Sequence, residues 1–114
     1  LTQWAAQGIL MLHQAMSVPP HTPGAHTDLW KPFSDHLMEF LLARDDLVWI
    51  LLGRSRQTMK AYILMSNNTH TIIDATRPHS MEAASSSLVA FEGGRVFRRV
   101  NDHFRARRQP PIVW

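Results

Sequence analysis

The arginines of this sequence are its clearest indication of a binding function. The chain of 114 residues carries 12 lysines and arginines against 9 aspartates and glutamates. Half of these basic residues stand in one C-terminal stretch, as Arg95, Arg98, Arg99, Arg105, Arg107 and Arg108. Clustered guanidinium groups neutralise phosphates, so the stretch predicts weak, salt-dependent binding to nucleic acid. The alternative is a solvated helix face whose arginines pair with Asp102 and Glu92.

Three histidines and one aspartate are the candidates for proton transfer. His13 follows an apolar run, and it is either a ligand-binding residue or one that is hydrogen-bonded locally. His70 and His79 flank Arg77, and a functional role is the less favoured interpretation for both. Asp74 can act as a general base or cap a turn, and the turn is favoured.

Thiol and metal chemistry are not favoured. The sequence has no cysteine, which excludes disulfides, thiol catalysis and cysteine-bound zinc. His21 and His26 flank a proline-rich loop, but no third ligand follows at a suitable spacing, so a solvated loop is favoured. We therefore expect no metal and no cofactor.

The sequence predicts neither a membrane helix nor a signal peptide. No apolar run reaches the roughly 18 residues that a membrane helix needs. Leu1 is not followed by a basic region and a cleavage site, so no signal peptide is expected. Because the chain lacks an initiator methionine, we expect a processed product or a fragment.

The apolar pattern predicts three strands. Each is a short, continuously apolar or β-branched run, and they cover residues 8–12, 47–53 and 69–75.

Helices are predicted between and after these strands. The first has apolar residues three and four apart, begins at a cap formed by Thr27 or Asp28, and ends at Asp45 and Asp46. The second covers about residues 55–64. The last begins near Gly94, stops before Pro110, and turns one apolar face inward, made of Val96, Phe97, Val100 and Phe104.

This alternation of strand and helix predicts an α/β fold. Right-handed crossovers then give a parallel sheet with helices on both faces. Ligands bind such sheets at the carboxyl ends of the strands, which here follow Leu12, Leu52 and Ala75. Arg54, Arg56 and Arg77 are expected to project from these ends toward the mouth of a cleft.

Six short segments carry a resemblance. In order they are Leu1-x-x-Trp4-x-x-Gln7-Gly8 with the run to Leu12, Trp30-x-x-Phe33-x-Asp35, Val48–Gly53 with Gln57, Thr76–Met81, Gly93–Phe97 with Asn101, and Pro111–Trp114. Together they resemble the C-terminal half of uracil-DNA glycosylases, whose motifs read L-x-x-W-x-x-Q-G-V-L-L-L-N, W-x-x-F-T-D, V-F-L-L-W-G, A-H-P-S-P-L, F-G-x-x-H-F-x-x-x-N and P-I-D-W. The resemblance implies a three-layer α/β/α fold with a short parallel sheet, in which residues 1–114 form the C-terminal part of a single domain.

Two positions depart from the family where its chemistry lies. The resemblance places His13 in the uracil pocket, where the family has an asparagine whose amide both donates and accepts hydrogen bonds. It places Arg77 at the family's catalytic histidine, a hydrogen-bond donor to the developing uracil anion. Loss of a positioned donor of this kind typically slows a reaction by about 10²–10³-fold.

The DNA-contacting loops depart as well. Arg54 stands at a serine of the family, and only Pro78 is retained from the prolines of its H-P-S-P loop. Met81 stands at the leucine that wedges into the DNA stack, and methionine is apolar enough for that role. The DNA-binding residues implied by the resemblance and by the basic cluster are Arg54, Pro78, His79, Ser80, Met81, Arg95, Arg98 and Arg99.

The family's other half carries the rest of its site. Its G-Q-D-P-Y-H motif, with the water-activating aspartate, and a phenylalanine that stacks on uracil both precede the segment that resembles this chain. So does a strand that the family places between the first and second strands predicted here. An open edge exposes unpaired backbone, so we expect the chain to need that half or a protein partner, and to be insoluble, molten or oligomeric alone.

Three functions follow from this resemblance. The leading hypothesis is a catalytically inactive uracil-DNA glycosylase-like module with a scaffold or nucleic-acid-binding role. The second is part of an active enzyme of base excision repair that hydrolyses the N-glycosidic bond of uracil in DNA. The third is a structural subunit of a larger nucleoprotein assembly. The implied partner is DNA or another nucleic acid, and the implied location is intracellular, in a nucleus or mitochondrion.

Overall fold

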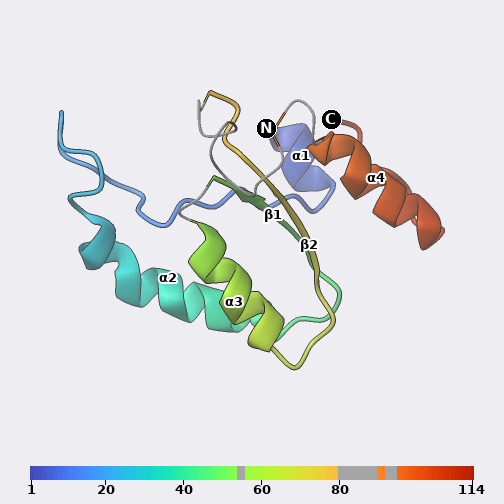
Figure 1. The fold of residues 1–114 in the computed structure, drawn as a ribbon, viewed down its shortest axis with the longest axis horizontal. Helices are drawn as coiled ribbons and strands as arrows, with labels where there is room; N and C mark the ends of the chain where they lie inside the picture. Colours follow the sequence, from blue (N-terminus) through green and yellow to red (C-terminus); the bar gives the residue numbers. More distant parts are fainter. Residues whose placement is uncertain (54–55, 80–89, 92–94) are drawn as a thin grey trace. The chain divides into compact units, whose positions relative to one another are not determined.

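The computed structural model of the chain describes residues 1–53, 56–79, 90–91 and 95–114 (Figure 1). The chain divides into two compact units, Leu1–Arg44 and Asp45–Trp114. None of the helices in the described ranges combines the length and the apolar character of a membrane span.

The first unit consists of two helices joined by an irregular segment. Helix α1 spans Thr2–Ala6 and α2 spans Thr27–Leu42. The predicted strand over residues 8–12 is wrong, since these residues form neither strand nor helix and the side chains of Leu10 and Met11 are 60% and 57% exposed. A strand is stable only where a neighbour satisfies its backbone groups, and this unit contains no strand.

Helix α2 confirms the helix predicted from the spacing of apolar residues, but its start differs. His26 occupies the N-cap position and makes no capping hydrogen bond with its side chain, so the expected cap by Thr27 or Asp28 is wrong. Asp28 falls inside the first turn, where its carboxylate interacts favourably with the helix dipole. Lys31 and Asp35 form an ion pair one turn apart on the exposed side.

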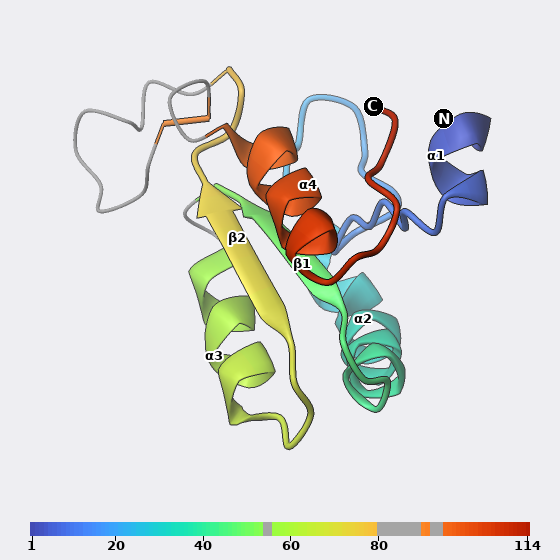
Figure 2. The same ribbon diagram turned by 90° about the vertical axis from the view of Figure 1, so that its right-hand side faces the viewer.

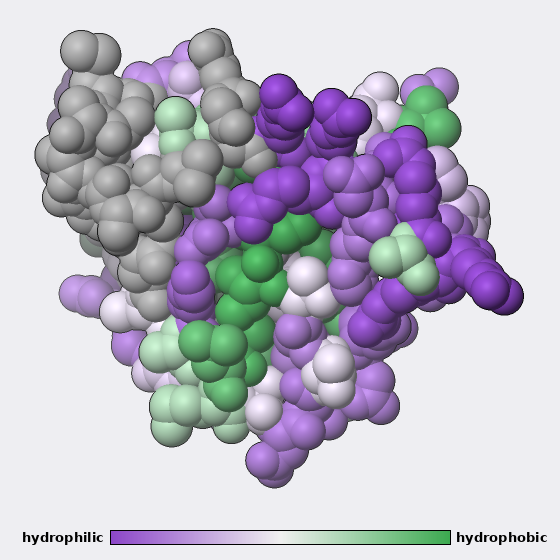
Figure 3. All heavy atoms as spheres, turned by 45° about the vertical axis from the view of Figure 1, so that its right-hand side comes forward, coloured by the Kyte–Doolittle hydropathy of each residue, from purple (hydrophilic) through white to green (hydrophobic). Residues whose placement is uncertain are grey.

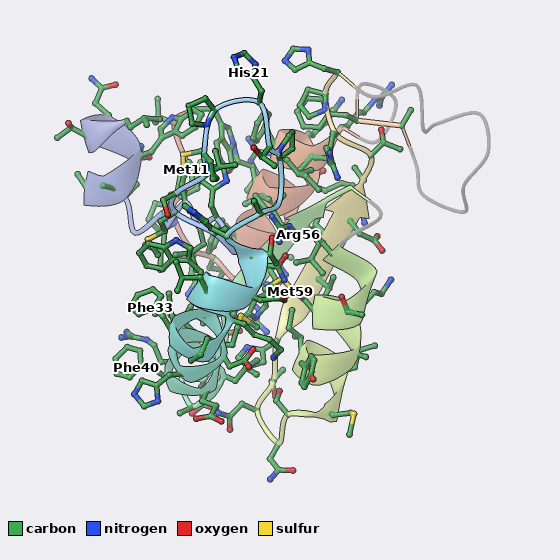
Figure 4. All side chains as sticks on the ribbon, turned by 90° about the vertical axis from the view of Figure 1, so that its left-hand side faces the viewer. Met11, His21, Phe33, Phe40, Arg56 and Met59 are labelled. Atoms are coloured by element: carbon green, nitrogen blue, oxygen red, sulfur yellow. The ribbon has the colours of Figure 1, made fainter. Side chains whose placement is uncertain are left out.

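One side of α2 is left uncovered. Leu29, Phe33 and Phe40 are 71%, 49% and 62% exposed, and no residue of this helix is buried. Spacings of four and seven place the three on one stripe, and Phe33 and Phe40 project from the same side in Figure 4. Half of the apolar side chains predicted to face the core from this helix are therefore exposed to solvent.

The second unit contains a two-stranded parallel sheet. Strand β1 spans Val48–Leu52 and β2 spans Thr71–Ala75, in a register that pairs Val48 with Thr71 and Leu52 with Ala75. Helix α3, at Gln57–Met65, connects them. These elements confirm the strands predicted over 47–53 and 69–75 and the helix between them.

Helix α4, at Val96–Ala106, packs on one face of the sheet. Ile73 and Ala75 of β2 and Val96 and Val100 of α4 form the buried core. Partly buried residues surround it, namely Val48, Ile50, Leu52, Phe91, Phe104, Ile112 and Trp114.

Helix α3 lies on the opposite face. Side chains alternate along a strand, so Asp74 points away from its core-forming neighbours Ile73 and Ala75. Its carboxylate accepts a hydrogen bond from Lys60 Nζ of α3 at 2.6 Å. Figures 1 and 2 show the two helices on opposite sides of the strands, which is the helix–sheet–helix layering that the sequence predicts.

The C-terminal tail is fixed to α4 by one amide side chain. Asn101 Nδ2 donates to the carbonyl oxygen of Ile112 at 2.9 Å, and Ile112 N donates to Asn101 Oδ1 at 2.8 Å. The Trp114 ring lies 4.5 Å from that of Phe97, between centroids. This ring contact docks the terminal tryptophan on α4.

Candidate functional site

The carboxyl ends of β1 and β2 form the edge at which the sequence places the ligand. Gly53 N donates to the Ala75 carbonyl at 2.8 Å, which extends the ladder by one residue beyond β1. The next residue on the other strand, Thr76, is 2% exposed, and its Oγ1 accepts a hydrogen bond from Phe91 N at 3.1 Å. The segments that follow β1 and β2 therefore both leave the sheet from a fixed position.

Arg77 folds back over the end of β1. A Cβ atom added to Gly53 would lie 2.6 Å from Arg77 Nε and 2.9 Å from Arg77 Cγ. Gly53 also has a φ of +93°, a conformation that side-chain-bearing residues rarely adopt. The absence of a side chain at position 53 thus gives the Arg77 side chain its place.

Arg56 lies beside Arg77. It holds the N-cap position of α3, and its backbone N donates to the Gly53 carbonyl at 3.2 Å. Burial, and then the neighbouring Arg77 guanidinium, lower the pKa of Arg56 below its ordinary value. Figure 4 shows Arg56 at the beginning of α3, one turn before Met59. Two arginines therefore follow the strands at this edge, and the charge of Arg77 acts on Arg56.

Helix α4 adds further arginines close by. It begins near the carboxyl end of β2 (Figure 2), and Arg99 Nη1 donates to the Asp74 carbonyl at 3.5 Å. Arg95, at the N-cap position, and Arg98 are exposed. The side of the molecule that carries α4 is largely hydrophilic in the space-filling view of Figure 3, around a smaller hydrophobic patch.

The later arginines of the cluster are engaged in ion pairs. Arg105 Nη1 lies 3.0 Å from Asp102 Oδ1 on the same helix, as the solvated-face interpretation expects. Arg107 pairs with Asp46, which precedes β1. The basic cluster therefore separates into an exposed part at the start of α4 and a paired part at its end.

Asp74 is not a turn residue. It lies within β2, so the favoured interpretation as a turn cap is wrong. Its carboxylate is 2.6 Å from Lys60 Nζ, with side-chain exposures of 36% for Lys60 and 23% for Asp74. The ion pair joins α3 to the sheet.

His70 and His79 lie at opposite ends of β2. His79 follows Pro78 at the carboxyl edge, and both residues are exposed. His70 precedes β2, so the expectation that it flanks Arg77 is wrong. Its ring stands edge-on to that of Trp49 at 5.9 Å, and neither ring nitrogen has a hydrogen-bond partner among the residues that the structure describes.

His13 belongs to the first unit. It is exposed and lines a shallow pocket. The other lining residues are Ala15, Met16, Ser17, Val18, Pro23 and Gly24. Arg77, the other predicted site residue, belongs to the second unit.

The proline-rich loop is held by hydrogen bonds to one serine. Ser17 Oγ lies 2.9 Å from His26 Nδ1 and accepts a hydrogen bond from Trp30 Nε1 at 2.8 Å. His21 is exposed, with a φ of +58°. Within the described ranges, no three histidine, aspartate or glutamate residues gather as a metal site would require.

Part of the predicted site lies outside the described residues, namely Arg54, Ser80 and Met81. The sequence predicts Arg56 near the cleft mouth, but it does not predict the effect of the Arg77 charge on this residue. The signal that could have revealed it is a glycine that ends one strand while arginines follow both strands.

Comparison with known proteins gives matches that cover the whole of this chain. A protein named uracil-DNA glycosylase from Streptococcus uberis is 34% identical over 100% of the chain and 51% of its own length. Proteins of the same name from Bacteroides thetaiotaomicron and Brevibacillus brevis are 33% and 34% identical, over 50% and 48% of their lengths. No protein-family model matches the chain.

The chain thus spans about half the length of the curated relatives that it matches, and the matched part is their C-terminal half. These relatives are bacterial, so they give no support to the expected location in a nucleus or mitochondrion.

Proposed function

Because the chain is homologous to the C-terminal half of uracil-DNA glycosylases, we propose that it is a uracil-DNA glycosylase-like module that binds nucleic acid and does not excise uracil. The observation that carries this proposal is the environment of Arg77. Its side chain lies over Gly53, and its charge, after burial, lowers the pKa of Arg56. The resemblance puts a histidine at position 77 in the active family.

Arginine and histidine differ in what they do for a leaving uracil. A neutral imidazole presents one donor at a fixed position, whereas arginine is permanently charged, longer and forked. The longer Arg77 side chain is accommodated because it lies over Gly53, which has no side chain, at the end of β1. This placement suits the binding of an anionic group better than the transfer of a proton.

Release of uracil from single-stranded, uracil-containing DNA tests the loss of chemistry. We expect no release above a buffer control from the 114-residue chain or from its Arg77→Ala variant. Release by the unmodified chain that Arg77→Ala abolishes would overturn the proposal. It would favour the alternative that this chain is part of an active uracil-DNA glycosylase.

Nucleic-acid binding is supported by the exposed arginines at the start of α4. Arg95 and Arg98 are exposed there, near the edge that carries Arg56 and Arg77. Contacts between such side chains and phosphates are independent of sequence and release counterions, so binding weakens as salt rises. We propose this edge as the surface that meets DNA.

A salt titration with a random duplex and a single strand tests this surface. Arg98→Gln should reduce the slope of log affinity against log salt by up to about one unit if Arg98 contacts a phosphate. Arg105→Gln is the matched control, because Arg105 is already paired with Asp102 on the same helix. Equal slopes for both variants, or no binding at low salt, would contradict the proposal.

A second candidate function is that of a structural subunit within a nucleoprotein assembly. It is favoured by the uncovered stripe of Leu29, Phe33 and Phe40 on α2. A partner chain, or a segment equivalent to the other half of the relatives, would cover such a stripe.

Light scattering tests this candidate. The unmodified chain should associate, and the Phe33→Ser, Phe40→Ser double variant should associate less. Met65→Ser, a change at a methionine of α3 that is 81% exposed, serves as the control and should have no effect. A monodisperse monomer of the unmodified chain would contradict this candidate.

A further inference from the structure

The edge of β1 that faces away from β2 has no hydrogen-bonded strand beside it in the described part of the chain. Residues along a strand direct their backbone N–H and C=O groups alternately to one neighbour and to the other. Gly53 N donates to the Ala75 carbonyl, so the odd-numbered residues of β1 face β2. The backbone groups at the outer edge therefore belong to Val48, Ile50 and Leu52, and none of them bonds to a backbone group of the described residues.

The outer edge of β2 is protected in a way that the outer edge of β1 is not. By the same alternation, Ile72 and Asp74 direct their backbone groups away from β1, and Arg99 Nη1 donates to the Asp74 carbonyl at 3.5 Å. Proteins protect exposed strand edges with charged side chains and prolines. Strand β1, with the sequence Val-Trp-Ile-Leu-Leu, contains neither. It is thus the edge at which another strand can add.

The sequence around β1 is complementary to itself in the antiparallel direction. Asp45 and Asp46 precede the strand, and Arg54 and Arg56 follow it. Two parallel copies of β1 in register would place like charges side by side, which is unfavourable. Two antiparallel copies bring the acidic end of each strand to the basic end of the other. Asp46 already pairs with Arg107, whereas Asp45 is exposed and forms no ion pair with the described residues.

We propose that two copies of this chain associate by antiparallel pairing of their β1 strands, with Ile50 opposite Ile50 of the second copy. Val48 then lies opposite Leu52 of the second copy. Opposite residues exchange both N–H···O bonds at every second position of an antiparallel pair, so this register satisfies all three outward-facing residues. A twofold contact requires a surface that is complementary to itself, and the charge pattern around β1 provides one. The inference does not depend on the proposed function.

Amide hydrogen exchange, followed residue by residue with NMR, reads the pairing directly. In a single copy the amides of Trp49 and Leu51 are bonded to β2 and should be protected, whereas those of Val48, Ile50 and Leu52 should exchange faster. Pairing should protect these three as well, by at least about tenfold, as the protein concentration rises. Sedimentation velocity over the same range should show the mass of two copies. Protection that alternates along β1 at every concentration, or the mass of one copy throughout, would overturn the proposal.

Single cysteines test the register, since the chain has none of its own. The Cα atoms of opposite residues in a hydrogen-bonded pair lie about 5.5 Å apart, which a disulfide can span. Ile50→Cys should therefore form a covalent dimer on mild oxidation.

Val48→Cys is the matched control, because in this register the two copies of position 48 lie about 13 Å apart along the strands. It should not cross-link to itself, but it should cross-link to Leu52→Cys when the two variants are mixed. Far-UV circular dichroism verifies that each variant is folded. Cross-linking of Val48→Cys to itself as readily as Ile50→Cys would overturn the antiparallel register.

Charge reversal tests the orientation without altering the strand. Asp45→Lys should raise the Kd of the dimer by about tenfold, because both symmetric contacts change from attraction to repulsion. Glu39→Lys makes the same change in net charge at an exposed residue of α2 and should leave the Kd unchanged. An equal effect of both variants would show that total charge controls association, and it would contradict the antiparallel alignment.

Association through the uncovered stripe of α2 has a different outcome. The Phe33→Ser, Phe40→Ser double variant leaves β1 intact, so it should retain the pairing and the added protection of Val48, Ile50 and Leu52. If that variant is a single copy and protection along β1 alternates in the unmodified chain, the second candidate function stands and this inference fails.

Discussion

The two units of this chain respond differently to the same kind of apolar sequence. In Leu1–Arg44 no residue is buried, and several apolar side chains, among them those of Leu10, Met11, Leu29, Phe33 and Phe40, are exposed. In Asp45–Trp114 two strands pair with each other and α4 covers them, so that Ile73, Ala75, Val96 and Val100 form a core. An apolar run becomes a strand only where the chain supplies a neighbour for it.

Truncation of one apolar side chain in each unit gives the largest expected contrast. Ile73→Ala should lower the free energy of unfolding by about 2–5 kcal/mol, because Ile73 is 3% exposed and its loss leaves a cavity. Leu10→Ala, at a side chain that is 60% exposed, should cost less than about 0.5 kcal/mol. Urea denaturation measures both, and similar losses would break the distinction between the units.

The two units also offer a pair of glycines with positive φ. Gly53→Ala should cost about 1–3 kcal/mol, because the new Cβ meets Arg77 in addition to the backbone penalty. Gly8→Ala carries only the backbone penalty of about 1 kcal/mol, since no atom of the described residues lies within 4 Å of its Cβ position.

A double-mutant cycle isolates the contact. Arg77→Ala should reduce the cost of Gly53→Ala by about 0.5 kcal/mol or more. An additive cycle would show that Arg77 does not use the space over Gly53.

Amide side chains bonded to the backbone sharpen the comparison further. Asn101→Ala removes two hydrogen bonds to Ile112 and should cost about 1–3 kcal/mol in thermal or urea unfolding. Gln7→Ala removes an exposed bond from Gln7 Nε2 to the Gln3 carbonyl and should cost below about 0.5 kcal/mol. Fluorescence of Trp114 should report the released tail in the first variant only.

The smallest expected effect differs in sign between the units. Arg56→Gln relieves partial burial and like-charge repulsion, so it should raise stability by less than about 1 kcal/mol. Lys31→Gln breaks an exposed pair with Asp35 on α2 and should lower stability by about 0.3–0.5 kcal/mol. A loss of stability in Arg56→Gln would indicate an anionic partner already in place.

The second unit could largely be derived from the sequence. The continuous apolar run that ends before Gly53 is β1, and the β-branched run that ends at Ala75 is β2, as predicted. The spacing of Val96 and Val100 correctly predicted the inner face of α4. Each of these patterns records an environment that the chain itself provides.

The first unit could not be derived in the same way. The run from Gly8 to Leu12 has the composition of a buried strand, but composition does not state which strand pairs with it. The cap of α2 also shifted to His26, because the position of a helix end is decided by local geometry as well as by residue type.

The candidate site stands between these cases. The order of the strands predicted that residues after Leu52 and Ala75 share one edge, and they do. The glycine after β1 and the arginines after both strands are visible in the sequence, but the path of the Arg77 side chain over Gly53 is not. The same reasoning misplaced His70, since a residue five positions before a strand end lies at the other end of the sheet.

The Asn101 bridge has a consequence for how this chain tolerates substitution. Asn101 contacts the peptide group of residue 112 and makes both hydrogen bonds to main-chain atoms. Every residue except proline offers the same two atoms, so position 112 can vary among apolar residues at the expense of packing alone. Position 101 has no such latitude, because only an amide side chain of this length supplies a donor and an acceptor together. In a mutational scan, position 112 in the tail should therefore tolerate many substitutions, whereas position 101 on α4 should tolerate few.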